Sequence, residues 1–141
     1  MKIPGMIEFE TSVGIERPID EVYAYLSDPR NFPEWNSAVE SVRGAGSTYT
    51  MERRLPTGHA TNQLEIVNDE QPREFAIRTT AGPTPFLYRY RFAADNGKTV
   101  VRLDAQVELG GPAALVPQLA RRGVKKGVDD NLAALKTILE A

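Results

Sequence analysis

The feature that most constrains this chain is a long run of extended segments, each apolar on one side, followed by a single helical segment. From residue 38 onward, five turn signals separate segments in which apolar residues recur at every second position, and five turns predict six strands. Hairpin-length loops make neighbouring strands antiparallel, so the run predicts a curved meander with one apolar face to bury. The turns are predicted at Gly44–Gly46, Pro56–Gly58, Asn68–Pro72, Ala81–Pro85 and Asp95–Gly97.

The segment that can cover this face lies at the C-terminus. After the Gly-Gly-Pro sequence at 110–112 the apolar pattern becomes helical and continues to Glu140. About 24 helical residues would reach roughly 36 Å, the width of a small domain. Leu115 and Leu119 do not lie on the apolar stripe of this helix, so we expect a bend near Pro117 or Gly123. The predicted stripe consists of Ala120, Val124, Gly127, Val128, Asn131, Leu132, Leu135, Ile138 and Leu139.

The first 36 residues supply the remaining elements. Strict alternation of apolar and polar residues over 7–16 predicts a half-buried strand. Helical spacing over 18–27 predicts a short helix. Residues 30–36 have room for no more than one further helical turn, and there we expect Phe32 and Trp35 to cap an apolar space.

The order of elements predicts one α+β domain over residues 1–141: a seven-stranded curved antiparallel sheet, with two short helices after its first strand, wrapped around a long C-terminal helix. A net charge of -2 gives no overall positive field, so we expect no nucleic-acid partner. The absence of cysteine excludes disulfides and thiolate chemistry. With no apolar leader and no stretch of 18 apolar residues, we expect a cytoplasmic protein.

Two segments carry a resemblance to a known superfamily. Residues 16–36, ERPIDEVYAYLSDPRNFPEWN, join a proline that opens a helix to a D-P-x-x-x-P-x-W-like segment, and residues 130–141 are DNLAALKTILEA. With the order of elements, they resemble the START and Bet v 1-like helix-grip superfamily (SRPBCC), which includes polyketide cyclase/dehydrase-like proteins. The resemblance covers essentially the whole chain. It implies a helix-grip fold that holds a hydrophobic ligand between sheet and C-terminal helix, and it implies no particular catalytic residue.

Polar residues that share the register of core residues are candidates for the ligand site. Arg53 and Asn62 have this register on two neighbouring strands, and Asn131 falls in the helix stripe. Burying an amide without a partner costs about 2 to 7 kcal/mol, so such groups need a protein partner, a ligand or water. The alternative is that Arg53 and Asn62 lie at strand ends and return to solvent at the rim of the sheet.

The strongest aromatic row is Phe86, Tyr88, Tyr90 and Phe92 at every second position of one strand. Such rows usually fill a core, but a buried tyrosine hydroxyl needs a partner and could present a polar group to a bound molecule. The predicted ligand-binding residues are Phe32, Trp35, Tyr49, Met51, Arg53, Asn62, Leu64, Ile77, Tyr88, Tyr90, Leu103, Val124, Val128 and Asn131.

Residues suited to catalysis are few. His59 is the only histidine and follows a turn glycine, where a solvated loop residue is the ordinary interpretation. The carboxylates lie mostly on outward registers, so we expect neither a metal site nor a cofactor. Gly44-Ala45-Gly46 precedes an extended segment and predicts a hairpin, because a dinucleotide-binding motif would open a helix there.

One basic cluster lies on the C-terminal helix. It could dock on an anionic membrane surface, although a solvated face is the more ordinary interpretation. Asp129 and Asp130 follow two of its lysines by four residues, which is close enough for ion pairs within the helix. The cluster consists of Arg121, Arg122, Lys125 and Lys126.

These observations favour a carrier or sensor that binds a small hydrophobic, lipid-like or polyketide-like molecule between the sheet and the helix. The first alternative is a cofactor-free cyclase or dehydratase using the same cavity, in which Tyr88, Tyr90, Arg53 or Asn62 polarises a carbonyl group. The second alternative is a protein-interaction module with a filled core, which predicts an exposed apolar patch near Leu115 and Leu119.

Overall fold

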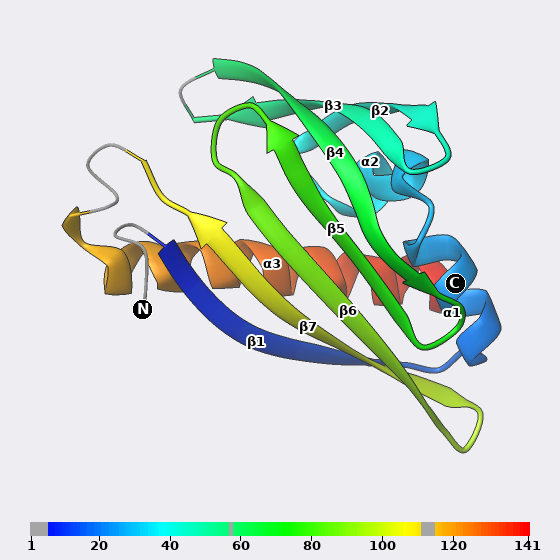
Figure 1. Cartoon of the computed structure of the whole chain (residues 1–141). Coiled ribbons are helices and arrows are strands. Elements are labelled where there is room, and N and C mark those ends of the chain that lie inside the picture. Colours follow the sequence, from blue (N-terminus) through cyan, green and yellow to red (C-terminus); the bar gives the residue numbers. More distant parts are fainter. Residues whose placement is uncertain (1–5, 57, 111–114) are drawn as a thin grey trace.

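A single antiparallel sheet organises the computed structural model, which describes residues 6–56, 58–110 and 115–141 (Figure 1). The strand order is β1-β7-β6-β5-β4-β3-β2, so β2 to β7 form the predicted meander and the first strand joins it beside the last. Thr57 of the second predicted turn and the Gly111-Pro112 break lie outside the described residues. The strands are β1 (Met6–Ile15), β2 (Val39–Ala45), β3 (Thr48–Leu55), β4 (Gly58–Glu70), β5 (Glu74–Ala81), β6 (Phe86–Asp95) and β7 (Lys98–Glu108).

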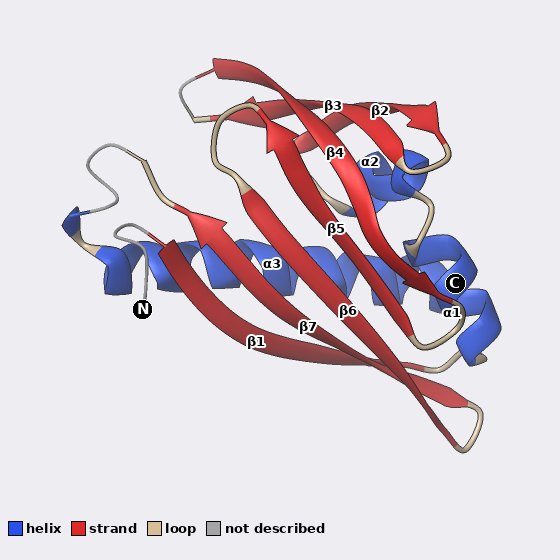
Figure 2. Ribbon diagram, in the orientation of Figure 1, coloured by secondary structure: helices blue, strands red, loops and turns tan. Residues whose placement is uncertain are grey.

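The described helices cover one side of this sheet (Figure 2). The helix expected over 18–27 is present as α1, and the 30–36 segment forms two single turns instead of one. The structure shows no break at either position where a bend is expected. The long helix begins at Pro117, a residue suited to a first turn, and continues through Gly123 to Glu140. None of the helices in the described ranges is long and apolar enough to cross a membrane. The helices are α1 (Ile19–Leu26), the 3₁₀ helix η1 (Pro29–Asn31), α2 (Phe32–Trp35) and α3 (Pro117–Glu140).

The strands bury the faces that their alternation predicts. In β7, for example, Val101, Leu103, Ala105 and Val107 are buried while the residues between them are half-buried or exposed. The inward residues of β1, β3, β5 and β6 join the same core. This concave face is therefore where an interior site can form.

The long helix buries a narrower stripe than the sequence predicts. Val128, Leu132 and Leu135 are buried, but Ile138 is 37% exposed and Gly127 lies at the surface. The reason is the position of α3, which packs mainly along β1, at one edge of the sheet, and also against α2. Only one side of the helix therefore meets the core.

Polar contacts along α3 tie it to β1 and the residue after it. They are spread from the first turns of the helix to its last, so they fix the direction of α3 relative to the strand as well as its position. The contacts are Arg121 Nε to the Glu8 carbonyl (3.0 Å), the Thr11 hydroxyl to the Asp129 carboxylate, Lys136 Nζ to the Gly14 carbonyl (2.8 Å) and the Glu16 N–H to the Glu140 carboxylate (2.8 Å).

The Asp129 contact predicts a pH-dependent contribution to stability. Partial burial opposes ionisation of Asp129, but hydrogen bonds from Thr11 and Lys125 outweigh it and hold its pKa below the usual range. A carboxyl group with a lowered folded-state pKa stabilises the fold above its unfolded pKa of about 3.9, and this contribution is lost as the pH falls through the folded value. Asp129→Asn should therefore lower the melting temperature at pH 7 by roughly 1 to 3 °C, and the difference should shrink as the pH falls below the unfolded pKa of about 3.9.

The matched control is Asp130→Asn, because Asp130 is 65% exposed and pairs only with Lys126. Thermal unfolding followed by circular dichroism should show a smaller change for this variant. Equal melting temperatures for the wild type and Asp129→Asn at pH 7 would contradict the prediction.

Candidate functional site

A partly enclosed cavity of about 50 Å³ lies between the concave face of the sheet and α2. Its walls come from the short helix, the start of β2 and the middle of three other strands. It is lined by Phe32, Trp35, Asn36, Ala38, Val39, Met51, Arg53, Ile77, Phe86, Tyr88 and Tyr90. The lining is mostly aromatic and aliphatic, with a few polar groups, as is usual for sites that bind small molecules.

The aromatic row of β6 forms one wall. Phe86 and Tyr88 have ring centroids 4.5 Å apart, and the rings of Tyr88 and Tyr90 meet edge to face at 6.3 Å. Among the described residues, neither tyrosine hydroxyl has a hydrogen-bond partner in the protein. Burial raises the pKa of Tyr88 to about 12, although the Arg53 guanidinium opposes the rise, and burial raises the pKa of Tyr90 well above its ordinary value. Both side chains are therefore neutral phenols at pH 7 that can donate a hydrogen bond.

Arg53 is the charged group of the cavity, and Asn62 holds it in place. Arg53 Nη1 donates to Asn62 Oδ1 (3.1 Å) and to the Pro83 carbonyl (3.4 Å), and its guanidinium lies 6.0 Å from the centroid of the Phe86 ring. Asn62 is fully buried and donates through Nδ2 to the carbonyls of Ala81 (3.2 Å) and Pro83 (2.9 Å). Burial lowers the pKa of the half-buried Arg53, partly offset by Tyr88. An arginine nevertheless stays charged at neutral pH.

Gly82 allows the connection after β5 to close on Asn62. Its φ of +104° lies in the region that favours glycine. A Cβ atom at this position would lie 2.3 Å from the Thr61 carbonyl oxygen and 2.6 Å from Asn62 Nδ2. Any larger residue would therefore push apart the loop and the amide that positions Arg53.

Trp35 carries an unpartnered polar atom in the wall opposite the sheet. The side chain is 5% exposed and packs edge to face against Phe32, with ring centroids 5.5 Å apart. Its buried Nε1–H has no hydrogen-bond partner within the described residues. Leaving a buried donor unpaired costs about 1 to 3 kcal/mol. Among the described residues, α2 therefore carries a buried hydrogen-bond donor whose desolvation is not compensated.

The cavity brings together half of the residues that the sequence predicts for the site. Asn62 does not line the cavity but accepts a hydrogen bond from Arg53, which does. Asn131 on α3 accepts a hydrogen bond from the Ser37 N–H (3.4 Å). The predicted residues at the cavity are Phe32, Trp35, Met51, Arg53, Ile77, Tyr88 and Tyr90. The predicted residues away from it are Tyr49, Asn62, Leu64, Leu103, Val124, Val128 and Asn131.

This division of the predicted residues has a physical cause. The prediction put the ligand between the sheet and the long helix, but the buried side chains of α3 pack into the hydrophobic core, and none of them lines the cavity. The wall of the cavity comes from α2 and the residues after it instead. Sequence analysis therefore missed Asn36, Ala38 and Val39, and it placed Phe86 in the aromatic row without assigning it to the site.

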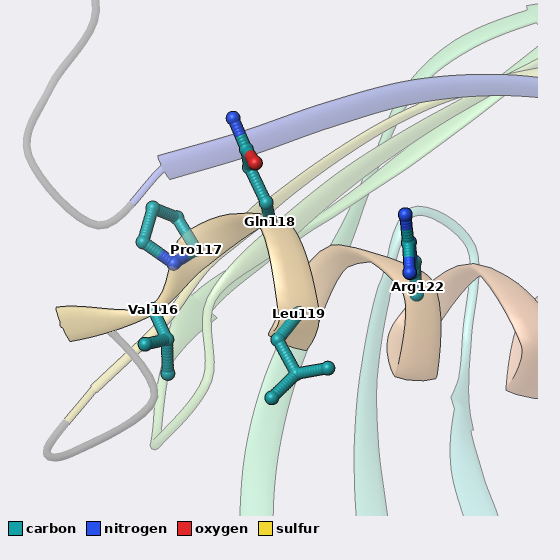
Figure 3. Close-up of a pocket in the computed structure, with 5 residues that line it drawn as sticks. All are labelled: Val116, Pro117, Gln118, Leu119 and Arg122. Carbon is teal, nitrogen blue, oxygen red and sulfur yellow. The ribbon is translucent and has the colours of Figure 1, made fainter.

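A larger hollow of about 450 Å³ lies at the start of α3, where Figure 3 shows Val116 and Leu119 on the same side of the first turn. Its described lining, which also includes Pro117, Gln118 and Arg122, comes entirely from this end of the helix. The described residues thus provide no opposing wall. The smaller, more enclosed cavity is the better candidate for a ligand site.

The remaining candidates lie outside the cavity. Lys125 and Lys126 form the predicted ion pairs with Asp129 (2.9 Å) and Asp130 (2.8 Å). His59 is exposed, and its Nδ1 lies 3.0 Å from the Glu40 carboxylate. The histidine is not among the residues that line the cavity.

Comparison with known proteins identifies the family. The model of the family described as "Polyketide cyclase / dehydrase and lipid transport" matches residues 6–140, so the chain belongs to this family. Its fold is the START and Bet v 1-like helix-grip fold that the sequence predicts. None of the curated proteins matches the chain.

Solved structures share the fold at low sequence identity. A START superfamily protein from Mycobacterium smegmatis has a TM-score of 0.80 and 13% identity, covering 94% of this chain and 97% of its own. A conserved protein from Geobacillus kaustophilus has a TM-score of 0.78 and 17% identity, with 94% and 95% covered. The di-domain ARO/CYC BexL from the BE-7585A biosynthetic pathway has a TM-score of 0.76 and 21% identity, covering 99% of this chain and 52% of its own.

The hydrogen bonds of Asn62 lead to a prediction about stability. Asn62→Ala would remove three hydrogen bonds, to the carbonyls of Ala81 and Pro83 and from Arg53, so it should lower the free energy of unfolding by about 1 to 3 kcal/mol. Gln63→Ala, at the exposed neighbouring position, should change it by less than about 0.5 kcal/mol. Urea unfolding measures both values, and equal stability of the two variants would contradict this role of Asn62.

Proposed function

We propose that the protein binds a small, largely apolar molecule in the cavity between the sheet and α2, as a carrier or sensor. The apolar walls would supply most of the affinity by removing the ligand from water, and Arg53, Tyr88 and Tyr90 would orient it. The observation that carries the proposal is the set of donors without partners in a partly enclosed aromatic site. The Trp35 N–H is buried without an acceptor among the described residues. The Tyr88 and Tyr90 hydroxyls, at the wall of the same cavity, also form no hydrogen bond with those residues, and a ligand oxygen could supply an acceptor.

Binding requires the cavity to expand. Its volume of about 50 Å³ is well below the roughly 300 Å³ or more that ligand sites usually have. The strands β3, β5 and β6 each pair on both sides, so the sheet is the rigid wall. The four-residue helix α2 with its unpaired Trp35 N–H is the wall that can move at the lowest cost. We therefore expect ligand binding to displace residues 32–39.

The enzyme alternative is less well supported. A cyclase or dehydratase needs a group that removes a proton, and burial keeps both tyrosines of the cavity protonated at pH 7. No carboxylate or histidine lines the cavity within the described residues. Arg53 and the tyrosines could polarise a carbonyl group, but no base accompanies them.

An interaction module is the second candidate, because its predicted apolar patch is present. Leu115 is 82% exposed and Leu119 is 67% exposed at the start of α3, and the interior cavity is small. Exposed apolar side chains in one patch are typical of protein contacts. This function requires a partner bound at the patch and no ligand in the interior.

Native mass spectrometry of the protein purified from its host tests the proposal. We expect a stoichiometric small molecule that denaturation releases and that carries at least one oxygen acceptor. A mass that corresponds to the bare chain, in protein that also fails to bind an added aromatic ketone, would contradict the proposal and favour the interaction module.

A neutral probe tests the two tyrosine hydroxyls. Because Trp35 is the only tryptophan, its indole N–H gives a single cross-peak in a ¹⁵N–¹H spectrum, whose shift reports binding of 2-acetylnaphthalene. Tyr88→Phe or Tyr90→Phe should weaken this binding about five- to tenfold, because each removes one hydrogen bond worth about 1 kcal/mol. Naphthalene, which has no oxygen, is the matched control and should bind the variants as it binds the wild type. Unchanged affinity for the ketone in both variants would remove these hydroxyls from the site.

A further inference from the structure

Arg53 has no carboxylate partner, whereas five other arginines of the sheet each have one. Every Asp and Glu of the sequence lies in the described ranges, and none forms an ion pair with Arg53. Its bonds go to a neutral amide and to a backbone carbonyl. Five other arginines of the sheet each pair with a carboxylate, namely Arg43, Arg54, Arg78, Arg89 and Arg91.

A half-buried guanidinium without a counter-charge is costly. A charge loses hydration when it is taken out of water, and only an opposite charge or several hydrogen bonds repay that loss. The Asn62 and Pro83 contacts both use Nη1, so the other N–H groups of the guanidinium have no acceptor among the described residues. Arg53 is thus held at the cavity wall with guanidinium N–H groups that can still donate hydrogen bonds to a ligand.

The other polar groups of the cavity are donors too. The Tyr88 and Tyr90 hydroxyls and the Trp35 N–H can each offer a hydrogen to an oxygen atom. The Asn36 Oδ1 acceptor is already engaged by the Ala38 N–H (3.0 Å). The cavity therefore presents one positive charge and several donors against aromatic walls, and it favours a group that only accepts and carries negative charge.

We propose that the ligand is an amphipathic carboxylic acid, bound as its anion, with the carboxylate on Arg53 and an aromatic or aliphatic body against α2 and β6. This inference rests on the proposed function and adds the chemical class of the ligand. Arginine pairs with carboxylates through two parallel hydrogen bonds, which gives direction as well as affinity. Asn62 and Gly82 then act as positioning residues, because they hold the guanidinium without needing to touch the ligand.

The test compares two probes of nearly the same shape. 2-Naphthoate is ionised at pH 7, and 2-acetylnaphthalene replaces one carboxylate oxygen by a methyl group. The dissociation constant of each is measured from the shift of the Trp35 indole cross-peak. We expect the wild type to bind 2-naphthoate at least about tenfold more tightly than the ketone, because a hydrogen bond to a charged group is roughly twice as strong as a neutral one.

Variants assign this preference to one side chain. Arg53→Met should abolish the preference, and Arg53→Lys should keep part of it, because the charge remains but the paired hydrogen bonds do not. The matched control is Arg54→Met, at the exposed neighbour whose guanidinium pairs with Glu40 (3.1 Å), and it should keep the full preference. The indole cross-peak position without ligand shows whether each variant retains the folded cavity.

The outcomes separate this inference from the proposed function. Equal affinities of the wild type for the acid and the ketone would overturn the carboxylate assignment and leave ligand binding in place. A preference that survives in Arg53→Met would overturn the role of Arg53. No shift with either probe would also count against the carboxylate, while the native mass measurement decides the proposed function separately.

Discussion

The structure depends on a mismatch in width between one sheet and one helix. Seven strands spaced about 4.8 Å apart make a surface nearly 29 Å wide, whereas a helix with its side chains is only about 10 to 12 Å across. The sheet carries its apolar residues on one face. The long helix α3 runs across this face and packs mainly along β1 (Figure 1). The short helix α2, which is a single turn, packs against β2 and α3. The cavity lies beneath α2, where the cover of the sheet is shortest.

Local patterns in the sequence predict the elements well. Alternation in residues 7–16 and in the six later segments predicts the strands, and turn residues predict the meander, because strand faces and hairpins depend on nearest neighbours. The position of α3 could not be predicted in the same way. Its stripe, from Ala120 to Leu139, shows that one side is apolar but not which strands that side meets. That choice depends on the curvature of the whole sheet, and it is why Val124 and Val128 do not line the cavity.

The sequence predicts which polar residues of the site face inward, but not the contacts that those residues form. Register alone predicts that Arg53 and Asn62 face inward, and Asn62 is fully buried. The bond between them also requires a connection after β5 that closes on Asn62 at Gly82, and this contact spans about 20 residues of chain. The missing counter-charge of Arg53 is a property of the whole set of ion pairs. No motif in the sequence indicates it.

A crystal structure of the protein with 2-naphthoate tests most directly the central claim that the interior beneath α2 is the binding site. We expect the naphthalene rings between α2 and β6, a carboxylate oxygen within hydrogen-bond distance of Arg53, and residues 32–39 displaced outward. The claim would be contradicted by a naphthoate bound instead at the hollow beside Val116 and Leu119, with the interior unchanged.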